Sequence, residues 1–183
     1  VVFMERGAKK SPSITYMYNK LKKQGKYKVT LHELQKNAGP ETQYYLNASK
    51  YIADCATAKA IAICTATDLM GYLQLRECTT YIQLWHGCVA CKKVGLSTIG
   101  KTFGKSEEAR QEYPDHTNYS YVTIASPAVS WIFEESMGID KDAGIIIPTG
   151  ISRTDVFFDE EYINSSYNKI HKIIPASKEK KII

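Results

Sequence analysis

The chain has 183 residues, which is long enough for one α/β domain with a sizeable core, and its formal net charge is +5. The basic surplus lies in residues 1–36, where nine Lys and Arg side chains stand against two Glu side chains. No run approaches the ~20 apolar residues of a membrane-spanning helix, so the sequence excludes such a span within these residues. The basic surplus could attract an anionic surface, a polyphosphate or a nucleic acid. A solvated basic helix face explains the same surplus, and this alternative stays open.

The predicted elements alternate between strand and helix. In chain order they are strand 1–5, helix 11–25, strand 27–31, helix 41–58, strand 60–64, a loop with a short helix over 65–78, strand 80–85, a Gly-rich connection over 97–105, helix 107–112, strand 119–124, helix 126–137, strand 144–147, and a short helix plus linker over 157–180. Ser11-Pro12 and Ser126-Pro127 are typical helix starts, because serine caps free N–H groups and proline fits the first helical position. This alternation predicts an α/β fold of three layers, with a mainly parallel sheet covered by helices on both faces.

Polar residues follow directly on three of the predicted strands. His86-Gly87 follows strand 80–85, Ser126 follows strand 119–124, and a turn from Thr149 to Arg153 follows strand 144–147. In parallel sheets, ligands bind outside the carboxyl ends of the strands. We therefore expect these three groups to lie on one edge of the sheet and to face one cleft.

His86 is the candidate catalytic residue. Histidine side chains titrate close to neutral pH, which suits a general base that takes a proton from an attacking hydroxyl. Gly87 follows it directly, and the missing Cβ would let a substrate or backbone approach closely. A histidine whose ring is satisfied by backbone groups at a strand end is the alternative, and the spacing alone leaves it open.

Cationic and capping residues near these strand ends are candidates for phosphate binding. Lys92 and Lys93 could neutralise a diphosphate, aided by free N–H groups if a helix begins near Cys88, or they could be ordinary surface lysines. Ser126 could hold an anion or simply cap its helix. Arg153 could clamp a phosphate, because a guanidinium binds two oxygens at once, and Asp155 could simply pair with Arg153.

The five cysteines and the remaining histidines give no clear metal site. Their odd number and apolar surroundings favour a reducing cytoplasm over a disulfide framework. Cys88 and Cys91 match the C-x-x-C pattern, but a second pair at metal spacing is missing and His86 is too close to serve as a partner ligand. We predict no metal site, and surface positions for the other histidines, which are His32, His116 and His171.

Three motifs together resemble a known family. The run Tyr81–Gly87, followed by Lys92-Lys93, resembles the W-H-G-x-x-x-K signature of the CDP-glycerol glycerophosphotransferases, the teichoic acid primases and polymerases of bacterial cell-wall synthesis. Tyr121–Pro127 continues the resemblance, and Ile147–Asp155 is similar to the family's T-G-x-P-R-x-D turn. Two departures stand out: Cys88-Val89-Ala90 replaces the usual Thr-Pro-Leu, and Ser152 replaces the usual proline.

This resemblance implies a fold and a set of site residues. It implies a GT-B-type transferase of two Rossmann-like domains with the active site between them. Residues 1–172 would form the N-terminal, acceptor-side domain, and 173–183 a linker into a C-terminal nucleotide-binding domain, so that the fragment alone would be inactive. His86 would be catalytic, and the substrate-binding residues would be Trp85, Gly87, Cys88, Val89, Lys92, Ser126, Thr149, Gly150, Arg153 and Asp155.

The implied reaction is transfer of glycerol phosphate, or another alditol phosphate, from a CDP-activated donor to a hydroxyl of a lipid-linked polyol-phosphate or glycan acceptor. CDP-glycerol would be the donor substrate, with no cofactor identified and any divalent-metal requirement left open. We expect a peripheral protein at the cytoplasmic face of a bacterial membrane and no nucleic acid partner. Two alternatives stay open: a glycosyltransferase that uses a nucleotide sugar, and a non-catalytic module that binds membrane or anionic polymer through residues 1–36.

Overall fold

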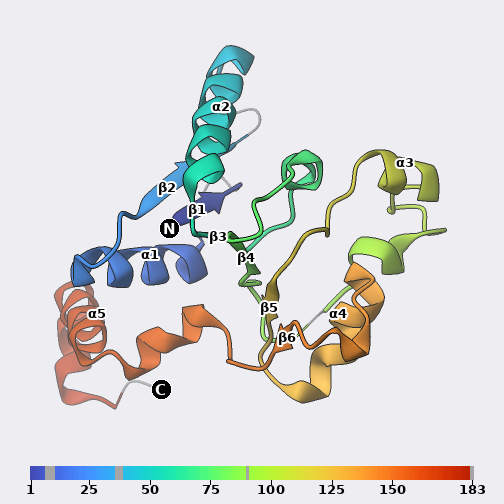
Figure 1. The fold of residues 1–183 in the computed structure, drawn as a ribbon. Coiled ribbons are helices and arrows are strands. Elements are labelled where there is room, and N and C mark those ends of the chain that lie inside the picture. The colour runs from blue at the N-terminus through green and yellow to red at the C-terminus, as the bar shows by residue number, and fades with distance from the viewer. Residues whose placement is uncertain (7–10, 36–38, 90, 182–183) are drawn as a thin grey trace.

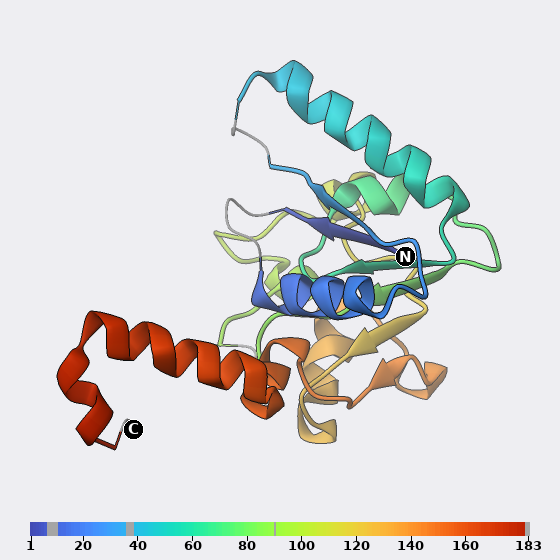
Figure 2. The same cartoon turned by 90° about the vertical axis from the view of Figure 1, so that its left-hand side faces the viewer.

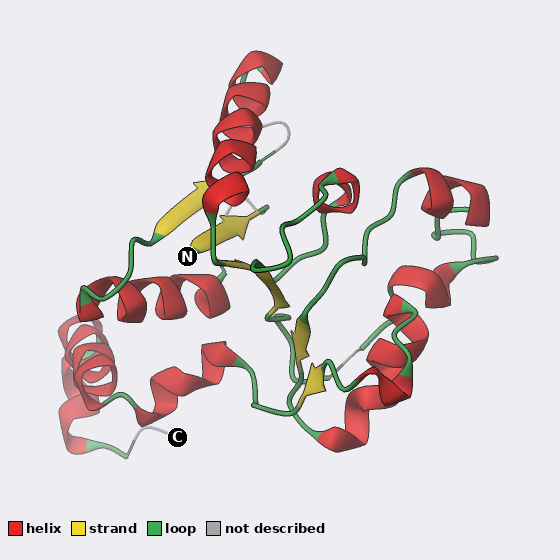
Figure 3. Ribbon diagram, viewed as in Figure 1, coloured by secondary structure: helices red, strands yellow, loops and turns green. Residues whose placement is uncertain are grey.

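The computed structural model describes residues 1–6, 11–35, 39–89 and 91–181. Its centre is a six-stranded sheet in the order β2-β1-β3-β4-β5-β6, with every neighbouring pair parallel (Figures 1 and 3). The strands are β1 Val2–Glu5, β2 Thr30–Glu33, β3 Ala60–Ile63, β4 Thr80–Gln83, β5 Tyr121–Thr123 and β6 Ile146–Ile147. The predicted α/β fold with a mainly parallel sheet is confirmed.

Five α-helices and six short 3-10 helices lie between and after the strands in the described part of the chain. The α-helices are α1 Pro12–Gln24, α2 Glu41–Thr57, α3 Glu107–Glu112, α4 Ser130–Met137 and α5 Glu160–Ile173. The 3-10 helices are η1 Asp68–Tyr72, η2 Gly95–Thr98, η3 Pro127–Val129, η4 Lys141–Ala143, η5 Ser152–Phe158 and η6 Pro175–Glu179. The predicted helix over 126–137 therefore begins with a 3-10 turn before α4.

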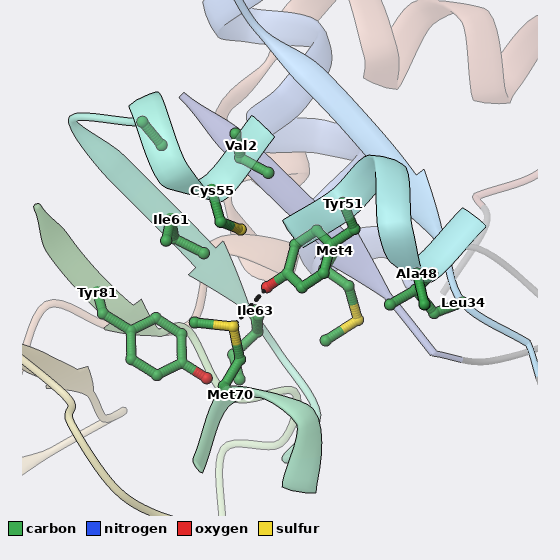
Figure 4. Packing of buried hydrophobic residues seen from close by; sticks show 11 residues of the cluster. Val2, Met4, Leu34, Ala48, Tyr51, Cys55, Ile61, Ile63, Met70 and Tyr81 are labelled. Carbon is green, nitrogen blue, oxygen red and sulfur yellow. Dashed lines mark hydrogen bonds between the residues drawn. The ribbon is translucent and has the colours of Figure 1, made fainter. Parts of the chain in front are cut away.

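The two faces of the sheet are covered by different helices because side chains alternate along each strand. On one face, Met4 of β1 and Ile63 of β3 pack against Tyr51 of α2 (Figure 4). On the other face, Phe3 packs with Ile14 of α1. A third cluster places α4 against β5, with Phe133, Met137 and Val122 among its buried members. The three predicted layers are thus formed by the period-two pattern of the strands.

The segment after β6 differs from its prediction. Instead of a short helix and a linker, residues 152–179 form η5, α5 and η6, and α5 alone has 14 residues. Asp159 begins α5 by accepting the N–H of Tyr162, and it also accepts the hydroxyl of Tyr16 in α1 at 3.0 Å. None of the residues of α5 is buried, and the helix projects away from the sheet beside α1 (Figure 2). The polar sequence of this segment therefore forms a longer helix than predicted, and the helix is bonded to α1 at its N-terminal end.

Two further predictions need correction. The second strand starts at Thr30, not at Tyr27, because its only partner is β1 and that pairing begins with Val2 opposite Thr30. The strand-forming residue Tyr27 is left exposed before it. His32, His116 and His171 were predicted as surface residues without partners, yet each is half-buried and contacts Asp54, the Tyr119 hydroxyl and the Ser177 hydroxyl, respectively.

The sheet order creates a crevice at the carboxyl end of its middle strands. The chain passes from β1 to β2 on one side and returns to place β3 on the other side of β1. Where strand order reverses in this way, the connections after the strands diverge and leave room for a ligand. The residues after β1, β3 and β4 meet at this point.

Candidate active site

A strained turn carries His86 out of the sheet. Trp85, two residues after β4, has a φ of +53°, a left-handed conformation that bulky residues rarely adopt. Buried Gln83 accepts the Trp85 N–H at 3.0 Å and donates to the Tyr119 hydroxyl at 3.1 Å. The Trp85 ring also meets Phe133 of α4 edge-on, with ring centres 5.3 Å apart. These contacts hold the turn in place.

The His86 ring is fixed in one tautomer by a backbone oxygen. Its Nδ1 lies 2.7 Å from the carbonyl oxygen of Cys64, just after β3. A carbonyl oxygen can only accept, so Nδ1 carries the hydrogen and Nε2 of the neutral ring keeps its lone pair. The His86 side chain is exposed, and the Trp85 ring lies against it with ring centres 4.6 Å apart. This arrangement is suited to accepting a proton at Nε2.

Arg153 reaches the same turn from η5. Its Nη1 donates to the backbone oxygen of His86 at 2.8 Å. The preceding turn is held to the sheet where the N–H of Gly150 donates to the Ile124 oxygen at 3.0 Å, and Gly150 has a φ of +84° that favours glycine. No Arg153–Asp155 ion pair is found among the described residues, so the simple pairing considered from the sequence is not formed.

A cavity of about 540 Å³ opens beside His86. Its lining comes from the ends of β1, β3 and β4 and from the segments after them, which meet at the crevice in the sheet. The lining residues are Arg6, Thr65, Ala66, Trp85, His86, Gly87, Val89, Cys91, Lys92, Val94 and His116. A histidine and two cations, Arg6 and Lys92, therefore face one hollow, which is a setting suited to chemistry on an anionic substrate.

The structure gathers some of the predicted site residues and separates others. Trp85, Gly87, Val89 and Lys92 line the cavity with His86, and Arg153 contacts the His86 backbone. The remaining predicted residues do not line it: Cys88, Ser126, Thr149, Gly150 and Asp155. The Ser126 hydroxyl accepts the N–H of Ala128 at 3.3 Å and so caps η3. No helix begins near Cys88 in the described part of this segment, where residues 88, 89, 91 and 92 form bends and 93 and 94 are irregular.

Sequence reasoning missed several residues of the cavity wall. Arg6 follows β1 and donates to the Ala66 oxygen at 2.9 Å, which joins the segments that follow β1 and β3. Buried Glu5 accepts the N–H groups of Arg6 and Ser11, and so joins the end of β1 to the start of α1. The sequence could have indicated a role for Glu5, because a carboxylate stands at the end of an apolar strand. For Arg6, the sequence showed only a basic charge.

His116 reaches the cavity from the segment before β5. The pKa of His116 is lowered to about 4, chiefly by burial; the charge of Asp115 opposes this shift, and the charges of Arg110 and Lys105 contribute to it. Its Nδ1 lies 3.1 Å from the Tyr119 hydroxyl, whose own pKa is raised to about 12 by burial. His116 is therefore neutral near pH 7 and supplies a polar, uncharged wall.

Neither a cluster of metal-ligating side chains nor a membrane-spanning helix is found in the described residues. No group of three or more His, Cys, Asp or Glu side chains within residues 1–6, 11–35, 39–89 and 91–181 is placed to hold a metal ion. Cys88 and Cys91 are free and exposed, and Cys55 and Cys64 are buried thiols. Within the same residues, no helix has the length and apolar character needed to cross a membrane.

Comparison with known proteins assigns the chain to one family. Residues 1–183 match the family described as CDP-Glycerol:Poly(glycerophosphate) glycerophosphotransferase. The teichoic acid ribitol-phosphate primase of Bacillus spizizenii is 31% identical over 167 residues, covering 90% of this chain and 42% of that protein. The ribitol-phosphate polymerase TarL of Staphylococcus aureus is 26% identical over 174 residues, covering 94% of this chain and 30% of that protein.

A solved structure of the wall teichoic acid polymerase TagF has the same fold. It superimposes with a TM-score of 0.65 at 19% identity, covering 95% of this chain and 45% of that chain. The expected Rossmann-like half of a GT-B-type transferase is confirmed at the level of the fold. The chain spans less than half the length of these relatives.

Proposed function

The chain belongs to the CDP-glycerol:poly(glycerophosphate) glycerophosphotransferase family, and on that premise we propose that it supplies the His86 side of an alditol-phosphate transferase active site. The donor would be a CDP-activated alditol and the acceptor a hydroxyl of a lipid-linked cell-wall polymer. The observation that carries this proposal is the Cys64 oxygen that fixes the His86 tautomer beside a cation-lined cavity. The roles given below to His86 and to the residues around it are part of the proposal.

The proposed reaction is a phosphoryl transfer. Nε2 of His86 takes the proton of the acceptor hydroxyl while the oxygen of that hydroxyl forms a bond to the β-phosphorus of the donor. The bond from that phosphorus to the oxygen bridging the two phosphates breaks, and CMP leaves with the electron pair. Arg6 and Lys92 line the cavity, and Arg153 keeps further N–H donors besides the one given to His86. These cations would offset charge on the phosphates, chiefly by positioning and electrostatics.

The identity of the alditol belongs to the proposal as well. Relatives include ribitol-phosphate and glycerol-phosphate enzymes, as the Bacillus spizizenii primase and the Bacillus subtilis teichoic acid glycerol-phosphate primase show by name. The complete natural protein should be offered CDP-glycerol, CDP-ribitol and a UDP-sugar, each with a lipid-linked acceptor. Release of CMP with extension of the acceptor by a CDP-alditol supports the proposal. Turnover of the UDP-sugar alone would replace it with the glycosyltransferase alternative.

Peripheral contact with an anionic membrane is a further part of the proposal. Lys20, Lys22 and Lys23 are exposed at the end of α1, and within the described part of the chain only Lys23 of the three forms an ion pair, with Glu161 at 3.0 Å. Lys9, Lys10 and Lys36, which also contributed to the basic surplus, lie outside the described residues. Lysines near an anionic surface each contribute about 1 kcal/mol of attraction.

Vesicle sedimentation tests this contact. The chain should bind vesicles rich in phosphatidylglycerol, and reversal of all three lysine charges should release it. Unchanged binding by that variant would remove the membrane contact from the proposal. If charge reversal abolished cellular activity while His86→Ala had no effect, the non-catalytic binding module would be the better account.

A further inference from the structure

Trp131 is an exposed tryptophan beside the candidate active site. It lies in the first turn of α4 with 59% of its surface exposed, whereas Trp85, the only other tryptophan, is 7% exposed. A large aromatic side chain left in solvent is a common feature of binding surfaces. The core of α4 is formed by Phe133 and Met137, so Trp131 is not needed to hold that helix in place.

Trp131 lines a hollow that borders the His86 cavity. The hollow has a volume of about 340 Å³ and is lined by Cys91, Lys92, Lys93, Val94, Ser97, Trp131, Ile132 and Glu135. Cys91, Lys92 and Val94 also line the cavity beside His86. The short segment 91–94 is therefore the common border of the two hollows, and the Lys92 side chain belongs to both.

Close packing fixes this border against α4. Gly95 has a φ of +53°, and a Cβ built there would come within 2.0 Å of the Ser136 oxygen, so η2 lies directly on the helix backbone. Lys93 and Glu135 add an ion pair across the same contact at 3.3 Å. Trp131 and Lys92 are thus held in a defined arrangement by the helix and the segment that carry them.

The two side chains offer complementary chemistry. Lys92 forms no ion pair with any residue in the described part of the chain, and its ammonium group can meet a phosphate. Trp131 presents a ring on which a nucleobase or a pyranose can stack. A linear alditol phosphate has no ring and would use only the lysine. The pair therefore fits a substrate portion in which a ring stands next to a phosphate.

We propose that this hollow is a substrate subsite in which a ring stacks on Trp131 and the neighbouring phosphate meets Lys92. The subsite deepens the proposed transferase function and rests on it for its link to turnover. Two substrates carry such a portion: the cytidine of the donor, and a sugar phosphate within the lipid-linked acceptor. Trp131 is a substrate-binding residue, because it touches the ligand and no reacting atom.

Fluorescence of the 183-residue chain tests binding without any turnover. Acrylamide quenching should report mainly Trp131, because Trp85 is buried. The probes are CMP, N-acetylglucosamine 1-phosphate and the ringless glycerol 3-phosphate. We expect one of the two ring-bearing probes to lower the acrylamide quenching constant of Trp131 at least twofold. The probe that does so identifies the source of the ring. Equal protection by glycerol 3-phosphate, or protection by none, would overturn the proposal.

Kinetics of the complete natural protein separate this subsite from the catalytic step. Trp131→Ala should raise KM for the ring-bearing substrate about 5- to 100-fold with kcat largely kept, as expected for loss of a stacking partner, and Trp131→Phe should recover part of it. Phe103→Ala removes another exposed aromatic ring, which lines neither hollow, and should change neither constant. Lys92→Ala should raise the same KM, with Lys101→Ala as its matched control.

The outcomes distinguish the subsite from the proposed function. An unchanged KM in Trp131→Ala, or a loss of folding by that variant together with no protection of the unchanged chain, would overturn the subsite. Protection of Trp131 combined with normal turnover by His86→Ala would leave the subsite in place and remove the catalytic proposal.

Discussion

Arg153 donates a hydrogen bond from Nη1 to the backbone oxygen of His86 at 2.8 Å, across 67 positions of the chain. The bond joins the segment after β6 to the turn after β4. On its other side, His86 is held by the Cys64 oxygen at the end of β3. The histidine is therefore positioned by groups from two other strand ends, and its orientation depends on the sheet as a whole.

Replacing Arg153 should impair turnover more than stability. In the complete natural protein, we expect Arg153→Ala to lower kcat about 10- to 100-fold, because the His86 turn loses an anchor and the phosphates lose a cation. Arg153→Lys should recover little, since an ammonium group cannot hold a carbonyl and a phosphate together in the guanidinium geometry. Steady-state kinetics with urea unfolding of each variant measures both effects.

Arg76→Ala is the matched control for this prediction. Arg76 donates from Nη2 to the Ala58 oxygen at 2.8 Å, the same type of bond formed away from the cavity. Its loss should cost about 1 kcal/mol of stability and leave kcat unchanged. Equal losses of kcat in both variants would contradict a specific role for Arg153.

Gly95 should tolerate no side chain. A Cβ there would come within 2.0 Å of the Ser136 oxygen, and the φ of +53° adds backbone strain. We expect Gly95→Ala to lower the free energy of unfolding by at least about 3 kcal/mol. Gly100 shares a positive φ, +73°, but has no heavy atom within 4 Å of such a Cβ. Gly100→Ala should therefore cost only about 1 kcal/mol in the same urea titration, and similar losses at both positions would contradict the packing of η2 on α4.

His116 should make the fold sensitive to mild acid. Its folded-state pKa is lowered to about 4, chiefly by burial, below the ordinary value near 6.5. Above pH 6.5 both states hold the ring neutral, so His116 adds no pH dependence. As the pH falls from 6.5 to 4, the unfolded state takes up the proton first, and the free energy of unfolding should fall by up to about 3 kcal/mol.

His116→Gln isolates this contribution, because glutamine can keep a hydrogen bond to Tyr119 but does not titrate. Urea unfolding at pH 7, 5.5 and 4.5 should show a flatter loss of stability for this variant than for the unchanged chain. Parallel losses in the two proteins would show that His116 is not buried as the structure has it.

Thiol labelling tests the burial of the cysteines. Cys78, Cys88 and Cys91 are exposed and should react with a disulfide reagent at pH 8 within minutes. Burial raises the pKa of Cys55 to about 11 and also raises that of Cys64, so these two should react only after unfolding. Cys88→Ser should remove one fast-reacting thiol. A number of fast-reacting thiols other than three in the unchanged chain would contradict this arrangement.

Local sequence patterns predicted the sheet and the edge on which the site lies. The apolar runs at 1–4 and 60–64 were sufficient because strands in the middle of a parallel sheet bury their side chains on both faces. The start of the strand after Gly25 was misplaced, since it is set by pairing with β1 and not by the strand-forming residues at 27–29. The length of α5 was missed because none of its residues is buried.

The cavity wall could be predicted only in part. His86, Gly87 and Lys92 lie within one motif, so their grouping follows from the strand that precedes them. Arg6 and His116 reach the cavity from distant segments, and nothing in their local sequence indicates contact with the turn after β4. For Ser126 the sequence left capping and anion binding open; its hydroxyl caps η3, and anion binding there stays a prediction.

The most direct test of the account is the turnover of His86→Ala in the complete natural protein with a CDP-alditol and a lipid-linked acceptor. We expect kcat to fall about 10²- to 10⁴-fold, the usual cost of losing a general base, while the urea unfolding curve stays close to that of the unchanged protein. His171→Ala, which removes a histidine bonded to Ser177 outside the cavity, should keep normal turnover. Near-normal turnover of a folded His86→Ala variant would contradict the assignment of His86 as the base.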